Sequence, residues 1–150
     1  MTNHAAAEAV KQGLFLAVAA GNSGLPAITS SPASESTVCT VGATDENDKL
    51  ASYSNYGSVV DILAPGTNIT STWIRNGTDT NTISGTSMAT PHITGLGAYL
   101  LALEGTRTPA GLCQHIRELS TKNKVSLGSM ASAPLLGRTK NQLAYNGNGA

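Results

Sequence analysis

The chain has 150 residues, a formal net charge of zero, 12% charged residues and 40% apolar residues. This length suits one domain with a sizeable core, which excludes a short peptide or a multi-domain machine. Zero net charge argues against nucleic acid or a membrane surface as the main partner, and the apolar content argues against a disordered chain.

Apolar runs and turn residues alternate along the first half of the chain. A short helix is expected at about residues 3–12, followed through Gly13 by a strand at 14–19. This segment also resembles a signal peptide. However, Glu8 and the alanines beside it favour a helix that leads into a strand. Three further apolar runs predict strands at 38–42, 59–63 and 69–74. Because the runs are continuous rather than alternating, we expect a largely parallel sheet that is buried on both faces.

The spacing of apolar residues becomes helical from Gly85 to Leu103. The stripe of this helix consists of Ile93, Leu96, Leu100 and Leu103, and the opposite side carries little polar surface. A helix of this kind is predicted to be central and buried. Another helix is expected from Pro109 to about Leu119, and the remainder is a weakly patterned tail without internal repeats. The sequence therefore predicts a single α/β domain over residues 1–150.

The two cysteines, Cys39 and Cys113, show no Cys-x-x-Cys spacing. A zinc–thiolate site is not supported, since it needs four close ligands. The spacing alone leaves two interpretations open, which are a pair of buried free thiols and a disulfide formed in an oxidising compartment.

The most informative segment is 85–92, which reads Gly-Thr-Ser-Met-Ala-Thr-Pro-His. In the simplest interpretation Ser87 caps a helix. However, the eight residues match the nucleophile motif of the subtilisin-like serine proteases, so the chain resembles that family. A hydroxyl at a helix N-terminus lies beside free N–H groups, which can receive the negative charge of an attacked carbonyl. The resemblance implies that Ser87 is the catalytic nucleophile of a serine endopeptidase.

The resemblance covers nearly the whole chain and is to the proteinase K branch. Residues 19–22, Ala-Ala-Gly-Asn, resemble the family segment in which an asparagine completes the oxyanion hole, although Asn22 alone is typical of a turn. The resemblance implies that Ala19, Ala20 and Gly21 bind substrate and that Cys39 and Cys113 form a disulfide. Further similarity lies at residues 31–35, 38–43, 54–58, 64–66 and 141–146. The implied fold is a subtilisin-like three-layer α/β fold with a mainly parallel sheet, of which this chain is the C-terminal half.

The resemblance implies no cofactor for the chemistry but does imply a structural calcium ion. Its ligands would be the backbone carbonyls of Ser36 and Val38 and the carboxylate of Asp61, and oxygen ligands suit calcium. Asp61 lies within an apolar run, and a buried carboxylate needs a partner. A hydrogen-bonded aspartate or a salt bridge is the alternative, and Ser36 stands where related sequences have proline.

Two motifs of the family, Asp-Thr/Ser-Gly and His-Gly-Thr-His, should precede Ser87, but neither occurs in the 150 residues. The three histidines, at 4, 92 and 115, are expected to be surface or packing residues. Three hypotheses remain. The chain is part of a secreted endopeptidase that acts on protein or peptide substrates, or an inactive fragment or pseudoprotease that acts as an interaction module. In the third hypothesis it binds a separate N-terminal half and restores the site.

Overall fold

The computed structural model describes residues 1–132 and 137–148. Helices α1, α2, α3 and α4 span Thr2–Lys11, Thr86–Glu104, Pro109–Leu119 and Gly128–Ser132, and a 3-10 turn, η1, spans Ala27–Thr29. The strands are β1 (Ala17–Ala19), β2 (Cys39–Thr44), β3 (Ile62–Pro65), β4 (Ile69–Thr72), β5 (Thr80–Ile83), β6 (Thr121–Lys122) and β7 (Gln142–Leu143).

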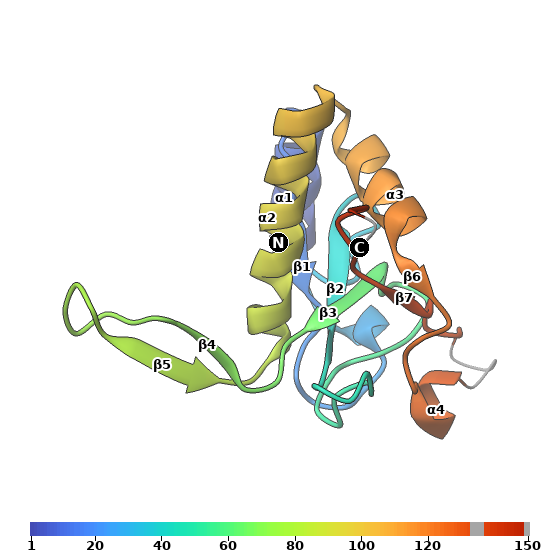
Figure 1. Cartoon of the computed structure of the whole chain (residues 1–150). Coiled ribbons are helices and arrows are strands. Elements are labelled where there is room, and N and C mark those ends of the chain that lie inside the picture. The colour runs from blue at the N-terminus through green and yellow to red at the C-terminus, as the bar shows by residue number, and fades with distance from the viewer. Residues whose placement is uncertain (133–136, 149–150) are drawn as a thin grey trace.

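The main sheet has the order β1-β2-β3-β7-β6. Its first four strands are parallel to their neighbours, and β6 pairs antiparallel with β7 at the edge. Strands β4 and β5 form a separate antiparallel hairpin, which projects away from the sheet in Figure 1. The expected mainly parallel sheet is therefore present.

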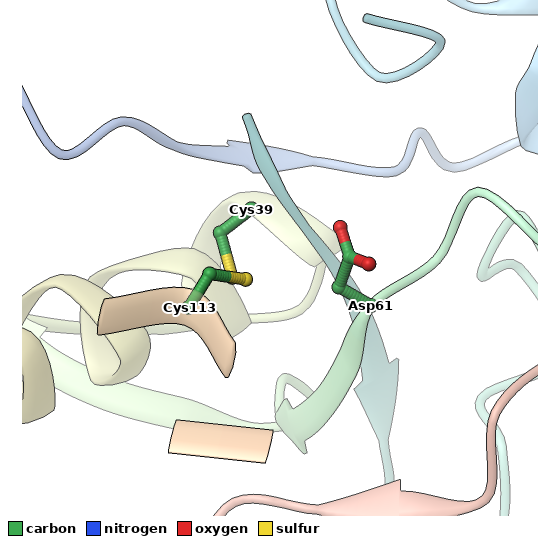
Figure 2. Close-up of side chains that lie close together, drawn as sticks. All are labelled: Cys39, Asp61 and Cys113. Carbon is green, nitrogen blue, oxygen red and sulfur yellow. A yellow bond between two sulfur atoms is a disulfide. The ribbon is translucent and has the colours of Figure 1, made fainter. Parts of the chain in front are cut away.

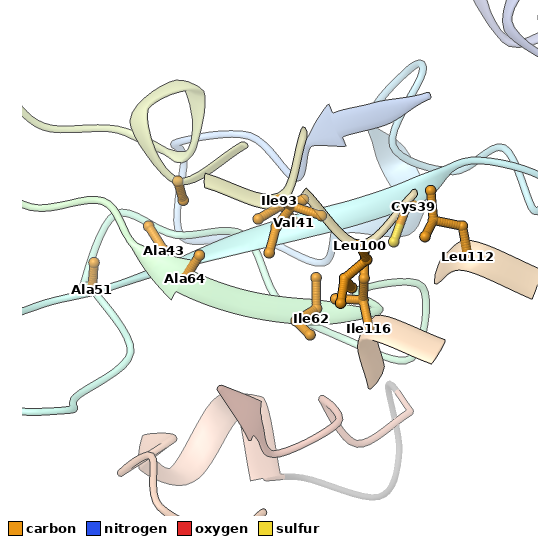
Figure 3. Packing of buried hydrophobic residues seen from close by; sticks show 11 residues of the cluster. Cys39, Val41, Ala43, Ala51, Ile62, Ala64, Ile93, Leu100, Leu112 and Ile116 are labelled. Atoms are coloured by element: carbon orange, nitrogen blue, oxygen red, sulfur yellow. The ribbon is translucent and has the colours of Figure 1, made fainter. Parts of the chain in front are cut away.

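The sheet is covered on both faces, as its continuous apolar strands require. On one face, Val41 and Ile62 pack with Ile93 of α2 and Ile116 of α3 (Figure 3). On the other face, α1 packs through Ala6 against Val18 and Val38. A second cluster on that face joins loop residues to β3, and it contains Ala20, Ala27, Val60, Leu63 and Val125. The result is the three-layer arrangement that the sequence predicts.

Helix α2 is buried on one side only. Ala89, Ile93 and Leu100 are inaccessible on the side that faces the sheet. Leu103, which we expected in the buried stripe, is 63% exposed, and Tyr99 is 40% exposed. The expected central helix is therefore present and buried on its sheet-facing side, but its expected burial fails at Leu103, since nothing among the described residues covers the second side.

Other strands have different bounds from those expected, because pairing with neighbouring strands determines where each one begins and ends. The strand expected at 59–63 begins at Ile62, because Val60 instead packs into the loop cluster. The run at 69–74 forms a hairpin strand outside the main sheet. The tail contains β6, α4 and β7, of which residues 133–136 lie outside the described part.

The disulfide implied by the resemblance is present between β2 and α3. Cys39 and Cys113 are bonded, and their Cα atoms are 5.8 Å apart. Helix α3 is placed for this bond by its own start signal, in which the Thr108 side chain accepts from the Gly111 N–H and Pro109 occupies the first turn. The bond fixes this helix to the middle of the sheet.

We predict that replacing both cysteines with alanine lowers the free energy of unfolding by about 4 kcal/mol. The physical reason is that the bond closes a segment of 74 residues in the unfolded chain. Urea titration measures the loss. Either single replacement should cost nearly as much as the double one, because one missing partner already opens the loop. Losses that simply add would contradict the prediction.

A small ionic cluster joins the end of α2 to α3. Arg107 donates a 2.9 Å hydrogen bond to Glu104, which holds the pKa of the Glu104 carboxyl below its ordinary value. His115 of α3 lies 2.7 Å from the same oxygen and adds to this lowering. The Nε2 atom of His115 is buried and has no aligned hydrogen-bond partner among the described residues.

The Glu104 cluster predicts a pH dependence. Because the folded-state pKa is below the unfolded one, the stabilisation is present above about pH 4.3 and is lost as the pH falls through the folded-state pKa. Glu104→Gln should therefore lower the urea midpoint at pH 7, and the difference from wild type should vanish at acidic pH. Glu46→Gln, in an exposed turn, is the control and should change neither. A difference that persists at acidic pH would contradict the assignment.

Candidate active site

Ser87 lies in the first turn of α2, at the end of the helix that faces the projecting hairpin. It is exposed, whereas its neighbours Gly85 and Thr86 are buried. The amide groups of a first helical turn have no acceptor within the helix, and the helix dipole is positive there. The Ser87 hydroxyl and its own N–H are therefore both open to an incoming group.

Asn22 is fixed beside this helix end by Thr86. The Asn22 Oδ1 atom accepts hydrogen bonds of 2.8 Å from both the backbone N–H and the hydroxyl of Thr86. Because a backbone N–H can only donate, the atom that faces it must be the oxygen of the amide. The Nδ2 group is thus left as the donor, and it lies on the side of Gly85, 3.4 Å from the place of a Cβ there. An amide donor and an exposed hydroxyl therefore lie at one helix end.

The loop that carries Asn22 is organised by Asn55, which is buried. Its Nδ2 group donates to the Ala20 carbonyl at 3.0 Å, and its Oδ1 atom accepts from the N–H groups of Ser23 and Leu25 at 3.1 and 3.0 Å. Gly21 has φ +107°, and a Cβ at that position would lie 2.3 Å from the Asn55 side chain. The loop is closed by the Gly21 N–H, which donates to the Thr86 hydroxyl at 3.2 Å.

Thr86 and Asn55 are functional candidates that sequence reasoning missed. Thr86 contacts Asn22 directly across 64 residues of sequence, whereas Asn55 holds the loop on either side of Asn22. Thr86 belongs to the quoted nucleophile motif and Asn55 to the quoted 54–58 segment, but nothing in the residue types alone indicates these partners. The only available signal was that the two segments belong to the resemblance.

The expected substrate wall follows directly from β1. Ala19 ends that strand, Ala20 is fully buried and Gly21 begins the loop. These three small residues lie between β1 and the start of α2, where the Ala20 carbonyl accepts from Asn55 and the Gly21 N–H donates to Thr86. Their role in binding substrate stays a prediction, as do the catalytic roles of Ser87 and Asn22.

The expected calcium ligands Val38 and Asp61 directly precede β2 and β3, so they lie at the opposite end of these strands from the start of α2. Val38 is buried directly before β2, and Ser36 and Asp61 line one cavity of about 310 Å³. The Asp61 carboxylate accepts a 2.8 Å hydrogen bond from Lys140 and a 3.0 Å bond from the Thr40 N–H. The calcium assignment stays a prediction, and the salt-bridge alternative describes the observed contact.

None of the three histidines is engaged with Ser87. His4 is exposed on α1, His92 contacts the Met88 carbonyl at 2.9 Å, and His115 lies against Glu104. Within residues 1–132 and 137–148, the Ser87 hydroxyl has no side-chain hydrogen bond.

An apolar hollow of about 430 Å³ lies beside the start of α2. Its walls come from the inner side of the hairpin and from the first two turns of the helix, and they include Ile69, Trp73, Ile83, Met88, Pro91 and His92. This hollow therefore borders the helix end that carries Ser87.

A serine at a helix N-terminus, above the carboxyl ends of parallel strands and next to an amide donor, is typical of α/β serine hydrolases. The chain belongs to the subtilase family, since the model described as "Subtilase family" matches residues 1–141. The structure is similar to the crystal structure of a cold-adapted subtilisin-like serine proteinase, with a TM-score of 0.84 and 39% identity. That match covers 96% of this chain and 49% of the other, so the expected incomplete subtilisin-like fold is confirmed.

Curated relatives agree with this assignment. The chain is 57% identical to the cuticle-degrading protease of Metarhizium anisopliae and 59% identical to the alkaline serine protease ver112 of Corniculantispora psalliotae, in each case over 97% of this chain and 35% of the relative. It is 55% identical to proteinase T of Parengyodontium album, over 99% of this chain and 47% of the relative. The chain thus spans about a third to a half of the length of these relatives, and its likeness to proteinase K-type subtilases is confirmed.

The contacts of Thr86 predict an effect on catalysis in an active polypeptide that contains these residues. Thr86→Val removes the hydroxyl that orients Asn22, so kcat should fall about tenfold or more, with little change in KM. This loss should stay below the 10²–10³-fold, a figure from subtilisin, that removal of the donor itself costs. Peptide hydrolysis measures the effect.

Two further variants separate positioning from general damage to the helix. Thr86→Ser keeps the hydroxyl and should recover most of kcat. Thr94→Val changes an exposed threonine of the same helix and should be neutral. Equal losses in all three variants would contradict the positioning role.

Proposed function

We propose that this chain is the nucleophile-bearing, C-terminal part of the catalytic domain of a secreted serine endopeptidase. The observation that carries the proposal is the exposed Ser87 hydroxyl in the first turn of α2, with the Asn22 amide held beside it by Thr86. Family membership supports hydrolysis of peptide bonds in protein or peptide substrates. The disulfide supports secretion, because such bonds persist in oxidising compartments. In the described part of the chain, no helix is both long and apolar enough to cross a membrane.

In this proposal Ser87 performs acyl transfer. Its Oγ atom forms a bond with the carbonyl carbon of the substrate, and its proton passes to a histidine that lies outside these residues. The carbonyl oxygen becomes negative and is stabilised by the Ser87 N–H and the Asn22 Nδ2 group. Collapse of this intermediate breaks the C–N bond as the same histidine returns the proton to the leaving nitrogen, which releases the amine and leaves an acyl-enzyme that water then hydrolyses. The residues 19–21 would form one wall of the pocket for the side chain that precedes the cleaved bond.

The uncovered side of α2 supports a second segment as the supplier of the base. A helix with almost no polar face is expected to be covered on both sides. Here the second side leaves Ala98, Tyr99 and Leu103 exposed, and it continues into the apolar hollow under the hairpin. Since the relatives are two to three times as long, residues of such a protein beyond the matched segment are the proposed cover for this surface.

An inactive interaction module is the competing function. It is favoured by the lack of a hydrogen-bonded partner for the Ser87 hydroxyl within the described residues. In subtilisin, loss of the catalytic histidine alone costs about 2 × 10⁶-fold in kcat. The 150 residues alone are therefore expected to be inactive under either function.

The deciding experiment compares the 150 residues alone with the same residues joined to a segment that carries the Asp-Thr-Gly and His-Gly-Thr-His motifs. We expect background hydrolysis of a chromogenic peptide by the first, and turnover and labelling by a fluorophosphonate in the second. Ser87→Ala should abolish both signals in the joined protein. Ser129→Ala, which changes an exposed serine of α4, is the matched control and should retain them.

The outcome is read from the joined protein in its folded form, verified by circular dichroism. A folded joined protein that neither turns over substrate nor reacts with the fluorophosphonate would reject the endopeptidase and leave the interaction module. Turnover by the 150 residues alone that Ser87→Ala removes would show that a group within the chain supplies the base.

A further inference from the structure

Asp61 lies where three parts of the chain meet. It immediately precedes β3, its N–H donates to the Thr40 carbonyl at 2.8 Å, and its carboxylate receives the Thr40 N–H in return. Lys140, which is 79 residues further along the chain and just before β7, donates to its other carboxylate oxygen at 2.8 Å. Both carboxylate oxygens are therefore in use.

The disulfide lies next to the Asp61 carboxylate. Figure 2 shows Asp61 beside Cys39 and Cys113, and a carboxylate oxygen lies within 4.8 Å of both sulfur atoms. Because both sulfurs are bonded to each other, neither is a thiolate that binds a metal. The carboxylate side chain is only 18% exposed and that of Lys140 is 32% exposed, so the pair is partly shielded from water.

The arrangement does not fit the calcium ion that the family resemblance implies. Calcium takes six to eight oxygen ligands from carboxylates, carbonyls and waters, and its charge requires a carboxylate that no other cation already contacts. The single carboxylate among the three expected ligands is already neutralised by an ammonium group in direct contact. A divalent cation at the same oxygen would have to displace Lys140 or lie against its positive charge.

We propose that the Lys140 ammonium is the resident cation of this site and takes the place of a metal ion. It satisfies the same requirement, which is a positive charge on a half-buried carboxylate at the start of a central strand. Like a bound metal ion, it also cross-links two segments, because it connects the residues before β7 to the start of β2 and β3. The consequence is that this part of the fold is stable without calcium.

Charge and geometry favour lysine as a substitute here. An ammonium is a compact charge with three donors, and one donor is used on Asp61. The cavity of about 310 Å³ around the pair is lined by further oxygen-bearing side chains, namely Ser34, Glu35, Ser36 and Ser58. Removal of the ammonium would thus leave a carboxylate beside other oxygens, which is a donor set that suits calcium.

The test uses Lys140→Met in the native polypeptide that contains these residues, with melting followed in EDTA and in 10 mM calcium chloride. In EDTA the variant should melt at a lower temperature than wild type. Calcium should then raise its melting temperature by about 3 °C or more beyond any rise seen in wild type. Isothermal titration should show one additional calcium site in the variant.

Two companion variants identify the site. Adding Asp61→Asn to Lys140→Met should abolish the additional calcium response. Lys124→Met removes an exposed lysine, 3.9 Å from Asp48, and should leave the calcium response as in wild type. The proposal is overturned if Lys140→Met acquires no calcium response. It is equally overturned if wild type has a calcium site that Asp61→Asn alone removes, because calcium would then displace the lysine.

Discussion

The packing of α2 across the parallel strands is the constraint on which the candidate site depends. Its first turn meets the chain where it leaves both β1 and β3. At the β3 end, the Gly85 N–H donates to the Gly66 carbonyl at 2.8 Å, and a Cβ on Gly66 would lie only 2.6 Å from that of Ala43. Close approach of the backbones is therefore what brings Ser87 and Asn22 to one point. The chemistry of the site rests on this junction more than on any single side chain.

Elements with local signals were predictable from sequence. Helix α3 begins and ends where expected because Thr108 caps it and Pro109 occupies its first turn. The apolar, β-branched residues of strand β2 predicted its bounds to within two residues at each end. In contrast, β5 consists mostly of polar residues and β7 has only two residues, so neither carries a periodic signal. Their existence depends on the partners that they pair with.

The residues of the candidate site also fall into those that the sequence predicted and those that it did not. Ser87 and Asn22 were found because their residue types occur in a recognisable order along the chain. Thr86 holds Asn22, whereas Asn55 holds the loop around it, and neither role is indicated by the sequence, because both depend on contacts between distant segments. The Lys140 partner of Asp61 belongs to this second group, since a salt bridge was foreseen as an alternative but its lysine was not. Residue type indicates a chemical role, whereas the groups that orient it are defined only by the fold.

The place of β7 in the sheet has a consequence for synthesis of the protein. Strand β7 lies between β3 and β6, and its Leu143 pairs with Leu63, which leaves the ribosome 80 residues earlier. During translation this edge of β3 therefore stays unpaired until residue 143 has been made. At about 5–20 residues per second this interval lasts several seconds, during which an exposed parallel edge can join other nascent chains. The β3 edge is closed only when β7 has emerged and paired with it.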